Sequence, residues 1–359
     1  MALMEYKCPN CDGAVSFDTG IQQMACPFCD STFEVEALKE YDEALKGCND
    51  EMNWEEREEV AWLDGEQEGM RAYSCNTCAG EVITDATTAA THCPYCGNPI
   101  VMVGQLSGAL KPDYVIPFKL NKEAAMEALT KHLSKKRLLP KCFKKNNHVE
   151  EVKGVYVPFW LYNADAGGTV IYRATRVRTW ADSRFTYTET RHFRIIRGGT
   201  LGFDQVPVDG STKMDSNLME SIEPFEMNAA APFQTAFLSG FLADKYDIDS
   251  EQGITRANER IKTSTEDAFS KTVSGYSSVR VEKSSLQMKK GTVKYALLPV
   301  WVLQTKWKDK QYLFAMNGQT GKFVGNLPVD WGLFFKYFFI ITIALAVIFN
   351  LVAWAVMSL

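Results

Sequence analysis

The chain has 359 residues, of which 46% are hydrophobic and 23% charged, and its formal net charge is −5. This composition is that of an ordinary globular protein, and the length is sufficient for more than one domain. The acidic balance argues against non-specific binding of nucleic acid, which depends on clustered Lys and Arg side chains that neutralise phosphates.

The first predicted element is a pair of C-x-x-C motifs near the N-terminus. "YKCPNC" contains Cys8 and Cys11, and "ACPFC" contains Cys26 and Cys29. The gap between the two motifs suits two short strands and a turn, so the four thiols can meet at one point. We therefore expect a four-cysteine zinc ribbon over residues 1–35.

A strongly acidic segment follows the first ribbon. Between Glu34 and Met70 the chain carries fourteen Asp and Glu residues against three basic ones. Apolar residues recur at helical spacing in its first half, which predicts an acidic helical linker over residues 36–70. Trp54 and Trp62 could fix this linker to a neighbouring surface. The charge itself is typical of a solvated helix face.

The cysteine pattern then recurs over residues 71–104. Cys75 and Cys78 lie in "YSCNTC", and Cys93 and Cys96 lie in "THCPYC", with the same inner spacing as in the first set. This repetition predicts a second zinc ribbon.

Two four-cysteine sets of equal spacing indicate two Zn²⁺ ions rather than disulfides or chance clustering. A thioredoxin-like pair would need a βαβ context, whereas here each pair faces another across short strands. Four protein thiolates leave no coordination position for water, so both sites are expected to be structural, and reduced thiolates are typical of the cytoplasm. The residues after the pairs tolerate the tight, often left-handed turns of a zinc knuckle: Asp12, Asp30, Ala79, Gly80 and Gly97.

Residues 105–330 are of single-domain size. Two helical regions are predicted within them. One lies near 122–139 after the capping residue Asn121, and the other lies near 232–271, where "FLSGFLA" is expected to form a core helix.

An internal echo indicates that this body is duplicated. "VKGVYVPFWL" at 152–161 and "VKYALLPVWV" at 293–302 share Val, Lys, Pro and Trp at constant offset. Each copy is followed by a Pro-Val-Asp, ending at Asp209 and Asp330. Strand-rich sequence follows both copies, including a hairpin with an Asn-Gly turn at 317–318. We therefore expect two β-units with inserted helices.

The last segment, residues 332–359, is predicted to be a transmembrane helix. From Phe338 to Leu359 the segment is apolar and its side chains are uncharged, with Asn350 the only strongly polar one, and its length matches the roughly 20 residues that cross a bilayer. Lys336 precedes the span and no basic residue follows it, which places the bulk of the chain in the cytoplasm. With no signal-peptide pattern at the start, we expect a tail-anchored, single-pass protein of the cell membrane.

One basic stretch lies outside the ribbons. Seven Lys and Arg residues between Lys131 and Lys145 could face nucleic acid or anionic lipid headgroups. Each four-thiolate zinc site adds about −2, which brings the net charge to about −9. The ribbon half lacks a basic cluster, so nucleic acid is the weaker alternative.

Catalytic signatures are not recognisable in the sequence. It contains no nucleophile elbow, phosphate-binding glycine loop or open metal site. His92, His132, His148 and His192 are each isolated from any nucleophile or carboxylate signature. We expect that the protein is not an enzyme and has no catalytic or cofactor-binding residues.

Several motifs together resemble one family. The paired ribbons, "WEEREEV", "TAATHCPYCGNPIV", "GVYVPFWL", "VPVDGS", "SIEPFE" and "LPVWVLQTKWKDKQYLFAMNGQTGKFVG" are similar to the bacterial TFIIB-type zinc-ribbon membrane proteins over nearly the whole chain. The resemblance implies an envelope-stress gene neighbourhood that encodes a PspA-like (phage-shock-protein-A-like) relative of ESCRT-III, an SPFH or virion-core-like protein and a TPM-domain protein. It also implies a membrane platform for these partners.

The sequence thus predicts a multidomain α+β protein with two N-terminal four-cysteine zinc ribbons, a duplicated β-rich cytosolic domain with inserted helices, and one C-terminal transmembrane helix. The expected function is a membrane-anchored scaffold or adaptor that recruits protein partners, with its oligomeric state left open. One alternative is a nucleic-acid-binding ribbon protein, which a salt-dependent affinity for DNA or RNA would favour. The other is an enzyme, which polar residues converging in a deep pocket would favour.

Overall fold

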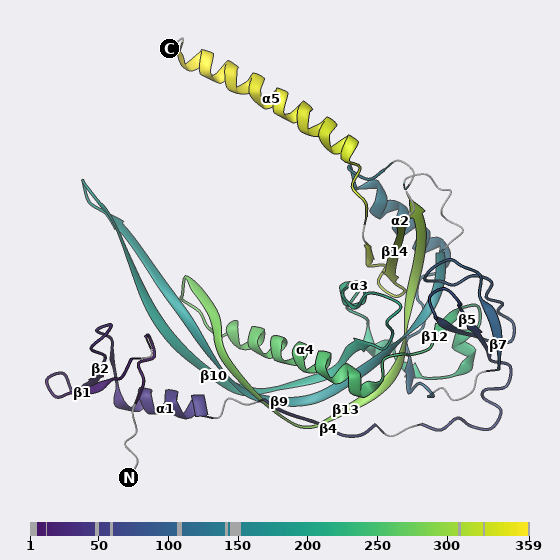
Figure 1. Cartoon of the computed structure of the whole chain (residues 1–359), viewed down its shortest axis with the longest axis horizontal. Helices are drawn as coiled ribbons and strands as arrows, with labels where there is room; N and C mark the ends of the chain where they lie inside the picture. Colours follow the sequence, from purple (N-terminus) through teal and green to yellow (C-terminus); the bar gives the residue numbers. More distant parts are fainter. Residues whose placement is uncertain are drawn as a thin grey trace. The chain divides into compact units, whose positions relative to one another are not determined.

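The computed structural model describes residues 6–11, 13–46, 50–57, 60–105, 110–140, 143, 152–307, 310–325 and 327–357 (Figure 1). The chain forms two compact units, each assembled from three segments. Unit 1 contains Met1–Arg57, Leu161–Pro207 and Ile254–Val293, and unit 2 contains Glu58–Trp160, Val208–Gly253 and Lys294–Leu359.

The first ribbon is a small antiparallel sheet in unit 1. Its strands are β1 (Ser16–Asp18), β2 (Gln23–Ala25) and β3 (Thr32–Phe33), in that order. Helix α1 (Val35–Lys46) follows, and its residue Leu38 is buried. The helix covers only the first part of the segment predicted to be a helical linker.

The rest of that segment in unit 1 contains a strand, which corrects the prediction of a helix there. Strand β4 (Glu51–Trp54) pairs in parallel with strand β13 (Ser278–Trp307). Trp54 anchors β4, because its indole Nε1 donates to Asn258 Oδ1 at 3.0 Å and its ring packs edge-on against Tyr162. Backbone pairing and this burial outweigh the helical tendency of the acidic sequence around the strand.

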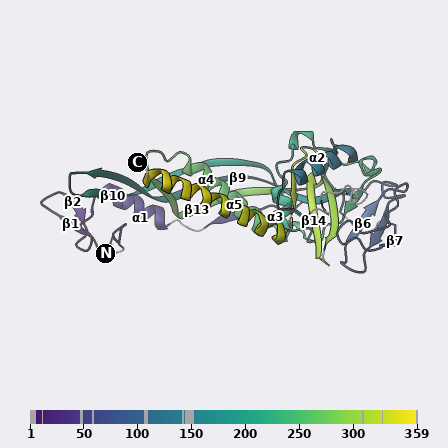
Figure 2. The ribbon, with the colours of Figure 1, turned by 90° about the horizontal axis from the view of Figure 1, so that it is seen from above.

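The core of unit 1 forms where helix α4 (Ser250–Ser270) lies along long strands. Figures 1 and 2 both show α4 beside β9 (Val152–Ala181), β10 (Thr186–Asp209) and β13. The hydroxyl of Tyr172 on β9 donates to the carbonyl of Glu266 on α4 at 2.6 Å. The apolar residues buried between these elements include Val170, Tyr172, Ala174, Ile195, Phe269 and Val273.

The described strands of the large sheet follow the order β11-β8-β13-β9-β12-β6-β5-β7. The hairpin of the second ribbon continues this sheet in unit 2, because β6 pairs antiparallel with β12 and β12 pairs in parallel with β9. The shorter strands are β5 (Arg71–Ser74), β6 (Glu81–Thr84), β7 (Val101–Gln105), β8 (Tyr114–Val115), β11 (Ala231–Pro232) and β12 (Leu242–Asp244).

The two copies of the sequence echo lie on β9 and β13, which are neighbours in the sheet. The proline carbonyl of each copy accepts a hydrogen bond from a glycine N–H. Gly210 donates to Pro158 and Gly318 donates to Pro299, both at 2.8 Å. The equivalent contacts agree with the echo, while duplication of the body remains a prediction.

The two tryptophans of the echo, Trp160 and Trp301, also form equivalent hydrogen bonds to backbone carbonyls. Trp160 donates through Nε1 to the carbonyl of Ile248 at 2.8 Å, and Trp301 donates to the carbonyl of Leu120 at 3.1 Å. Both rings are buried in unit 2. Each therefore ties its strand to a segment distant in sequence.

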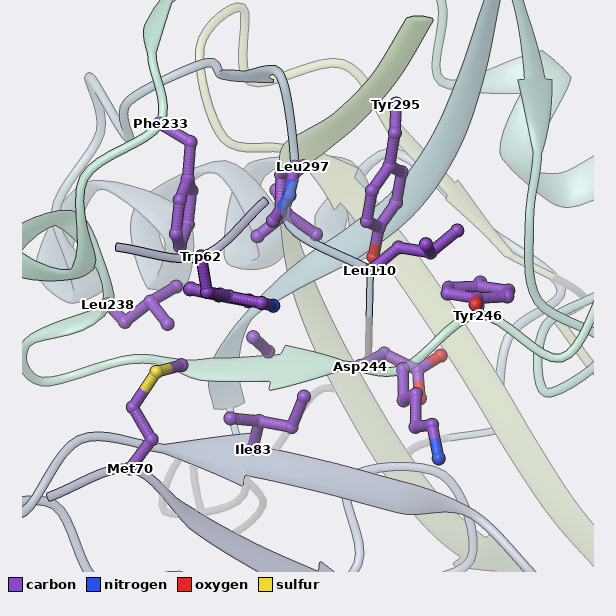
Figure 3. Close-up of a pocket in the computed structure, with 13 residues that line it drawn as sticks. Trp62, Met70, Ile83, Leu110, Phe233, Leu238, Asp244, Tyr246, Tyr295 and Leu297 are labelled. Carbon is purple, nitrogen blue, oxygen red and sulfur yellow. The ribbon is translucent and has the colours of Figure 1, made fainter. Parts of the chain in front are cut away.

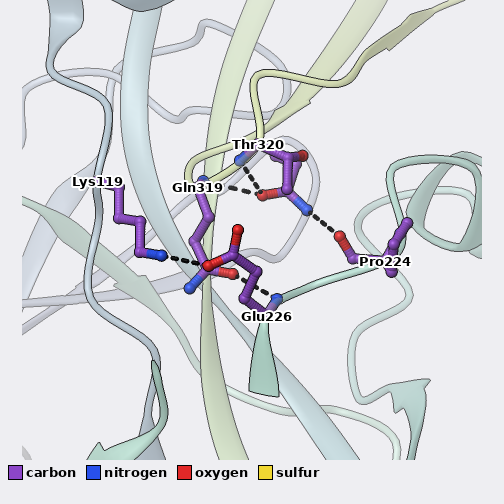
Figure 4. Close-up of polar contacts among 6 residues, drawn as sticks. Lys119, Pro224, Glu226, Gln319 and Thr320 are labelled. Carbon is purple, nitrogen blue, oxygen red and sulfur yellow. Dashed lines mark hydrogen bonds and ion pairs between the residues drawn. The ribbon is translucent and has the colours of Figure 1, made fainter. Parts of the chain in front are cut away.

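A hairpin follows the second copy, as the sequence predicted. Strand β14 (Lys310–Asn317) pairs antiparallel with β13 and with β15 (Phe323–Gly325). Asn317 is fully buried at the turn, where its side-chain amide donates to the carbonyls of Ile222 and Pro224, both at 3.1 Å. Its Oδ1 accepts from the backbone N–H groups of Gln319 and Thr320 (Figure 4).

A second set of polar contacts joins the same turn to Glu226 and Lys119, which precede it in the sequence. Gln319 Oε1 accepts from the backbone N–H of Glu226 at 2.9 Å, and the Glu226 carboxylate pairs with Lys119 (Figure 4). Two segments of the quoted motifs, "SIEPFE" and "MNGQTGKF", are thus held together by polar side chains.

Helix α2 (Lys122–Ser134) confirms the predicted N-cap, since Asn121 Oδ1 accepts from the N–H of Ala124 at 2.9 Å. The helix is shorter than the predicted 122–139. The chain leaves the helix after Ser134, and Leu139 is buried in the apolar cluster beneath α2. Short helices also occur at α3 (Ser216–Ser221) and in the 3-10 turn η3 (Met227–Ala229).

The predicted helix near 232–271 is wrong over its first half. Thr235–Leu238 forms a 3-10 turn, η4, and Leu242–Asp244 forms strand β12. Gly240 lies between them with φ of +80°, a left-handed conformation that ends the helical path. Only α4, from Ser250 onward, is the expected helix.

The last described element is helix α5 (Trp331–Met357). Its part from Trp331 to Val352 is long and apolar enough to span a membrane, and none of it is buried in the structure. Asp330 caps it, because its Oδ1 accepts from the N–H of Leu333 at 3.1 Å. One candidate transmembrane helix at this end of the chain is compatible with single-pass membrane attachment.

Candidate metal centres

The four cysteines of the first ribbon meet as predicted. The Sγ atoms of Cys8 and Cys29 lie 3.6 Å apart, and those of Cys11 and Cys26 lie 3.5 Å apart. All four sulfur atoms fall within 4.8 Å of one another. Cys8 and Cys26 are buried, whereas Cys11 and Cys29 are exposed.

The second ribbon repeats the arrangement. Cys75 and Cys96 have their Sγ atoms 3.4 Å apart, and Cys78 and Cys93 have theirs 3.6 Å apart. The four sulfur atoms again lie within 4.8 Å of one another. The burial is deeper than in the first ribbon, because Cys75 and Cys93 belong to the main apolar core of unit 2.

These distances suit a tetrahedral metal ion and not a disulfide. A Zn–S bond of about 2.3 Å places neighbouring sulfur atoms about 3.8 Å apart, close to the separations observed. A disulfide would need about 2.05 Å. Four thiolates are the donor set that zinc prefers in closed sites, so both clusters fit a zinc ion.

Local turns aim the thiols inward. The N–H of Asp30 donates to the carbonyl of Cys26 at 3.0 Å, that of Ala79 to Cys75 at 2.8 Å, and that of Gly97 to Cys93 at 3.1 Å. These three donors have φ of +54°, +54° and +70°. The expected left-handed turns are therefore present at three of the four pairs, and Asp12, after the remaining pair, lies outside the described residues.

Backbone N–H groups also point at sulfur. Asn10 N donates to Cys8 Sγ and Tyr95 N donates to Cys93 Sγ, both at 3.4 Å. Such bonds stabilise the thiolate, and therefore the form of cysteine that binds a metal ion.

The thiols within a cluster differ in acidity. Burial raises the pKa of Cys75, but backbone N–H groups of Cys78 and Thr77 outweigh it and lower that pKa to about 7. Burial raises the pKa of Cys93 well above its ordinary value. In the first ribbon the Ser31 side chain lowers the pKa of Cys29 to about 6. A metal ion must therefore displace protons from the less acidic thiols as it binds.

The ribbons also present apolar side chains to solvent. Strand β7 is the last strand in the order of the sheet, and its residues Val101, Met102 and Val103 are 56%, 56% and 70% exposed. On the first ribbon, Phe28 is 73% exposed. An exposed apolar edge strand is a template for pairing with another chain. The spacing of the cysteines predicts neither of these exposed apolar surfaces.

A small apolar cavity lies in unit 2 (Figure 3). Its volume of about 20 Å³ leaves room for about one water molecule. Trp62, from the acidic segment, packs edge-on against Phe233 here, with ring centroids 5.9 Å apart. Close to Trp62, Lys111 and Glu66 form a partly buried ion pair at 2.6 Å. The cavity is too small for a substrate of ordinary size.

Asp244 lines this cavity and is fully buried. Its Oδ2 accepts from the Ser211 hydroxyl at 2.6 Å, and its other side faces the Tyr95 hydroxyl without the geometry of a full hydrogen bond. Burial raises the pKa of Asp244 to about 7. Sequence reasoning missed this residue, because a lone Asp at the end of a short strand carries no pattern.

His92, His132 and His192, the histidines that the structure describes, do not join the clusters. His92 lies beside Thr91, with Nδ1 3.0 Å from Oγ1, and His132 packs against the Phe323 ring. His192 lines a hollow in unit 1, and His148 lies outside the described residues. Within the described part of the chain, the groups of His, Cys, Asp and Glu side chains with metal-binding geometry are the two cysteine clusters.

The sequence is 33% identical over 330 residues to a protein of Bacillus subtilis (strain 168) described as uncharacterized protein YdjG. The alignment covers 92% of each chain, so the similarity extends well beyond the cysteine motifs. No family model matches the sequence, and no solved structure matches it.

Proposed function

The chain belongs to the same family as YdjG of Bacillus subtilis, and for this member we propose a membrane-anchored scaffold that recruits protein partners. The observation that carries the proposal is the combination of two closed thiolate clusters with an apolar helix of spanning length in one chain. The clusters stabilise folded surfaces, and the helix concentrates those surfaces at a bilayer.

The metal is proposed to be zinc, with a structural role at both sites. Each cluster supplies four sulfur ligands, which complete a tetrahedral shell and leave no position for a substrate. The residues that would hold the two ions are Cys8, Cys11, Cys26 and Cys29, and Cys75, Cys78, Cys93 and Cys96. Zinc would supply folding free energy there and no chemistry.

The bulk of the chain is proposed to lie in the cytoplasm. Lys336 is the charged residue of helix α5 and lies in its second turn, near the end at which the preceding chain enters the helix. The positive-inside rule assigns that side to the cytoplasm, where thiolates remain reduced and available to a metal ion.

We propose that partners dock on the edge of the second ribbon. Strand β7 exposes three consecutive apolar side chains and is the last of the described strands in the order of the sheet, which suits strand addition by an extended segment of a partner. The partner classes implied by the sequence resemblance are PspA-like, SPFH-like and TPM-domain proteins. Their placement at a membrane agrees with the apolar helix.

The test is recruitment in cells. We expect a chain lacking residues 332–359 to remain folded and to keep its partner, because the span is unburied, while the partner leaves the membrane fraction. Affinity purification from mild detergent would identify the partner, and a fluorescent tag on it would report its location. The partner staying at the membrane in cells that carry only the truncated chain would contradict the proposal.

A point variant tests the docking surface separately. Val103→Lys adds a charge to the exposed edge and should abolish co-purification of the partner without loss of metal. Val281→Lys, at another exposed valine on a strand of unit 1, is the matched control and should retain the partner. Equal partner loss in both variants would exclude β7 as the specific docking edge.

A further inference from the structure

A second surface feature lies next to the apolar helix. Unit 2 contains a hollow of about 640 Å³ between the end of α2 and the chain that follows β15. One wall comes from α2 and the residues after it, and the other from β15 and the residues before α5. The lining residues are His132, Lys135, Lys136, Arg137, Leu138, Leu139, Phe323, Val324, Gly325, Leu327, Pro328 and Val329.

The first wall is cationic. Lys135, Lys136 and Arg137 are consecutive and exposed, and no carboxylate is among the lining residues. Within the part of the chain that the structure describes, none of the three forms an ion pair. Basic residues at a helix C-terminus often serve only to complement the helix dipole. Here they continue past the end of the helix and into the lining of a hollow.

The second wall is apolar. Phe323, Leu327 and Val329 line it, and Val329 is 42% exposed. His132 packs against the Phe323 ring with centroids 4.7 Å apart, which joins the two walls at one side. A ligand that fills the hollow must therefore offer negative charge on one side and apolar surface on the other.

Hydrogen bonds fix the hollow beside the start of α5. The N–H of Asp330 donates to the carbonyl of Leu138 at 2.8 Å, and its carbonyl accepts from the N–H of Phe334 at 2.9 Å. The Asp330 carboxylate is engaged in capping α5 through Leu333. Since Val329 is separated from Trp331 by one residue, the hollow opens directly before the apolar helix.

We propose that this hollow binds the headgroup of an anionic phospholipid. The three cations would contact the phosphate, and the apolar wall would contact the glycerol and the first acyl carbons. A free phosphate ion shares the charge but would leave the apolar wall without a partner. The proposal rests on membrane attachment through α5, and it does not depend on the recruitment of protein partners.

The test uses the full chain in detergent micelles. Native mass spectrometry would compare retention of added phosphatidylglycerol with retention of phosphatidylcholine. We expect a preference for phosphatidylglycerol, and the triple variant Lys135→Gln, Lys136→Gln, Arg137→Gln should weaken phosphatidylglycerol binding on the order of 100-fold, from about a fivefold loss for each basic residue near an anionic headgroup.

The control removes equal charge elsewhere. Lys271→Gln, Arg280→Gln and Lys283→Gln alter three exposed basic residues of unit 1, and this variant should keep the preference. Loss of the preference in the control, or its survival in the Lys135–Arg137 variant, would overturn the proposal.

Two further arms separate lipid from free phosphate. Val329→Asn changes an exposed residue of the apolar wall, and it should reduce phosphatidylglycerol retention without altering the fold. Inorganic phosphate should fail to displace the lipid. Displacement by inorganic phosphate together with an unaffected Val329→Asn variant would assign the hollow to a free anion and refute the lipid site. Partner co-purification, measured in the same variants, should not change.

Discussion

Asn317 offers a quantitative test of how the second echo strand is held. Asn317→Ala removes two hydrogen bonds donated to the carbonyls of Ile222 and Pro224 and two accepted from the N–H groups of Gln319 and Thr320. Each such bond contributes about 0.5–1.5 kcal/mol net, and the side chain of Asn317 is fully buried. We expect the free energy of unfolding of unit 2 to fall by about 2–4 kcal/mol.

The assay is thermal unfolding of the full chain in detergent, followed by near-UV circular dichroism. For a unit of this size the loss corresponds to a decrease in Tm of about 6–12 °C. Asn228→Ala, at an exposed asparagine in the neighbouring 3-10 turn, is the matched control and should change the unfolding free energy by less than about 0.5 kcal/mol. A loss below about 1 kcal/mol in Asn317→Ala would show that the buried amide does not organise the turn.

Elemental analysis of the purified chain should find two zinc ions, and Cys93→Ser should remove one of them. Recovery of iron, or of no metal from freshly reduced protein, would contradict both sites. Burial raises the pKa of Asp244 to about 7 in the folded state, which is above its value in the unfolded chain. The folded state therefore binds the proton more tightly, and the free energy of unfolding falls as pH rises from about 4 through 7. Asp244→Asn should therefore stabilise the protein more at pH 8 than at pH 6, measured by chemical denaturation. The full chain should show no affinity for duplex DNA at physiological salt; tight binding there would favour the nucleic-acid alternative.

The two cysteine clusters could be predicted from sequence because the information that specifies them is local. Each C-x-x-C carries its own turn, and the sets share one inner spacing, so the eight clustered cysteines can be identified without knowledge of the rest of the fold. The left-handed residues Asp30, Ala79 and Gly97 could be predicted for the same reason. The cysteine spacing could not predict that the second ribbon continues the large sheet through the pairing of β6 with β12. Strands that pair at a distance in sequence produce no local sequence pattern.

Two segments were wrongly predicted to be helical because a weak local sequence pattern was outweighed by a stronger pattern around it. Residues 51–54, "EMNW", alternate polar and apolar, which is a strand pattern, but the acidic run around them favoured a helix. In "FLSGFLA" the apolar content favoured a helix, although Gly240 marked a break. For the hollow between the end of α2 and the chain that follows β15, the sequence indicated only the basic wall. The apolar wall comes from residues nearly 200 positions further along the chain.

Helix α5 is longer than the layer that it is suited to cross. Its 27 residues correspond to about 40 Å at 1.5 Å per residue, whereas the hydrocarbon layer is about 30 Å thick. The excess equals about two helical turns, and Trp331, Lys336 and Tyr337 all belong to the first two turns, where such side chains favour the headgroup region. A thinner bilayer would enlarge this mismatch. Because Asp330 ties the helix start to Leu138, the resulting tilt would act directly on the loop that carries Lys135 to Arg137.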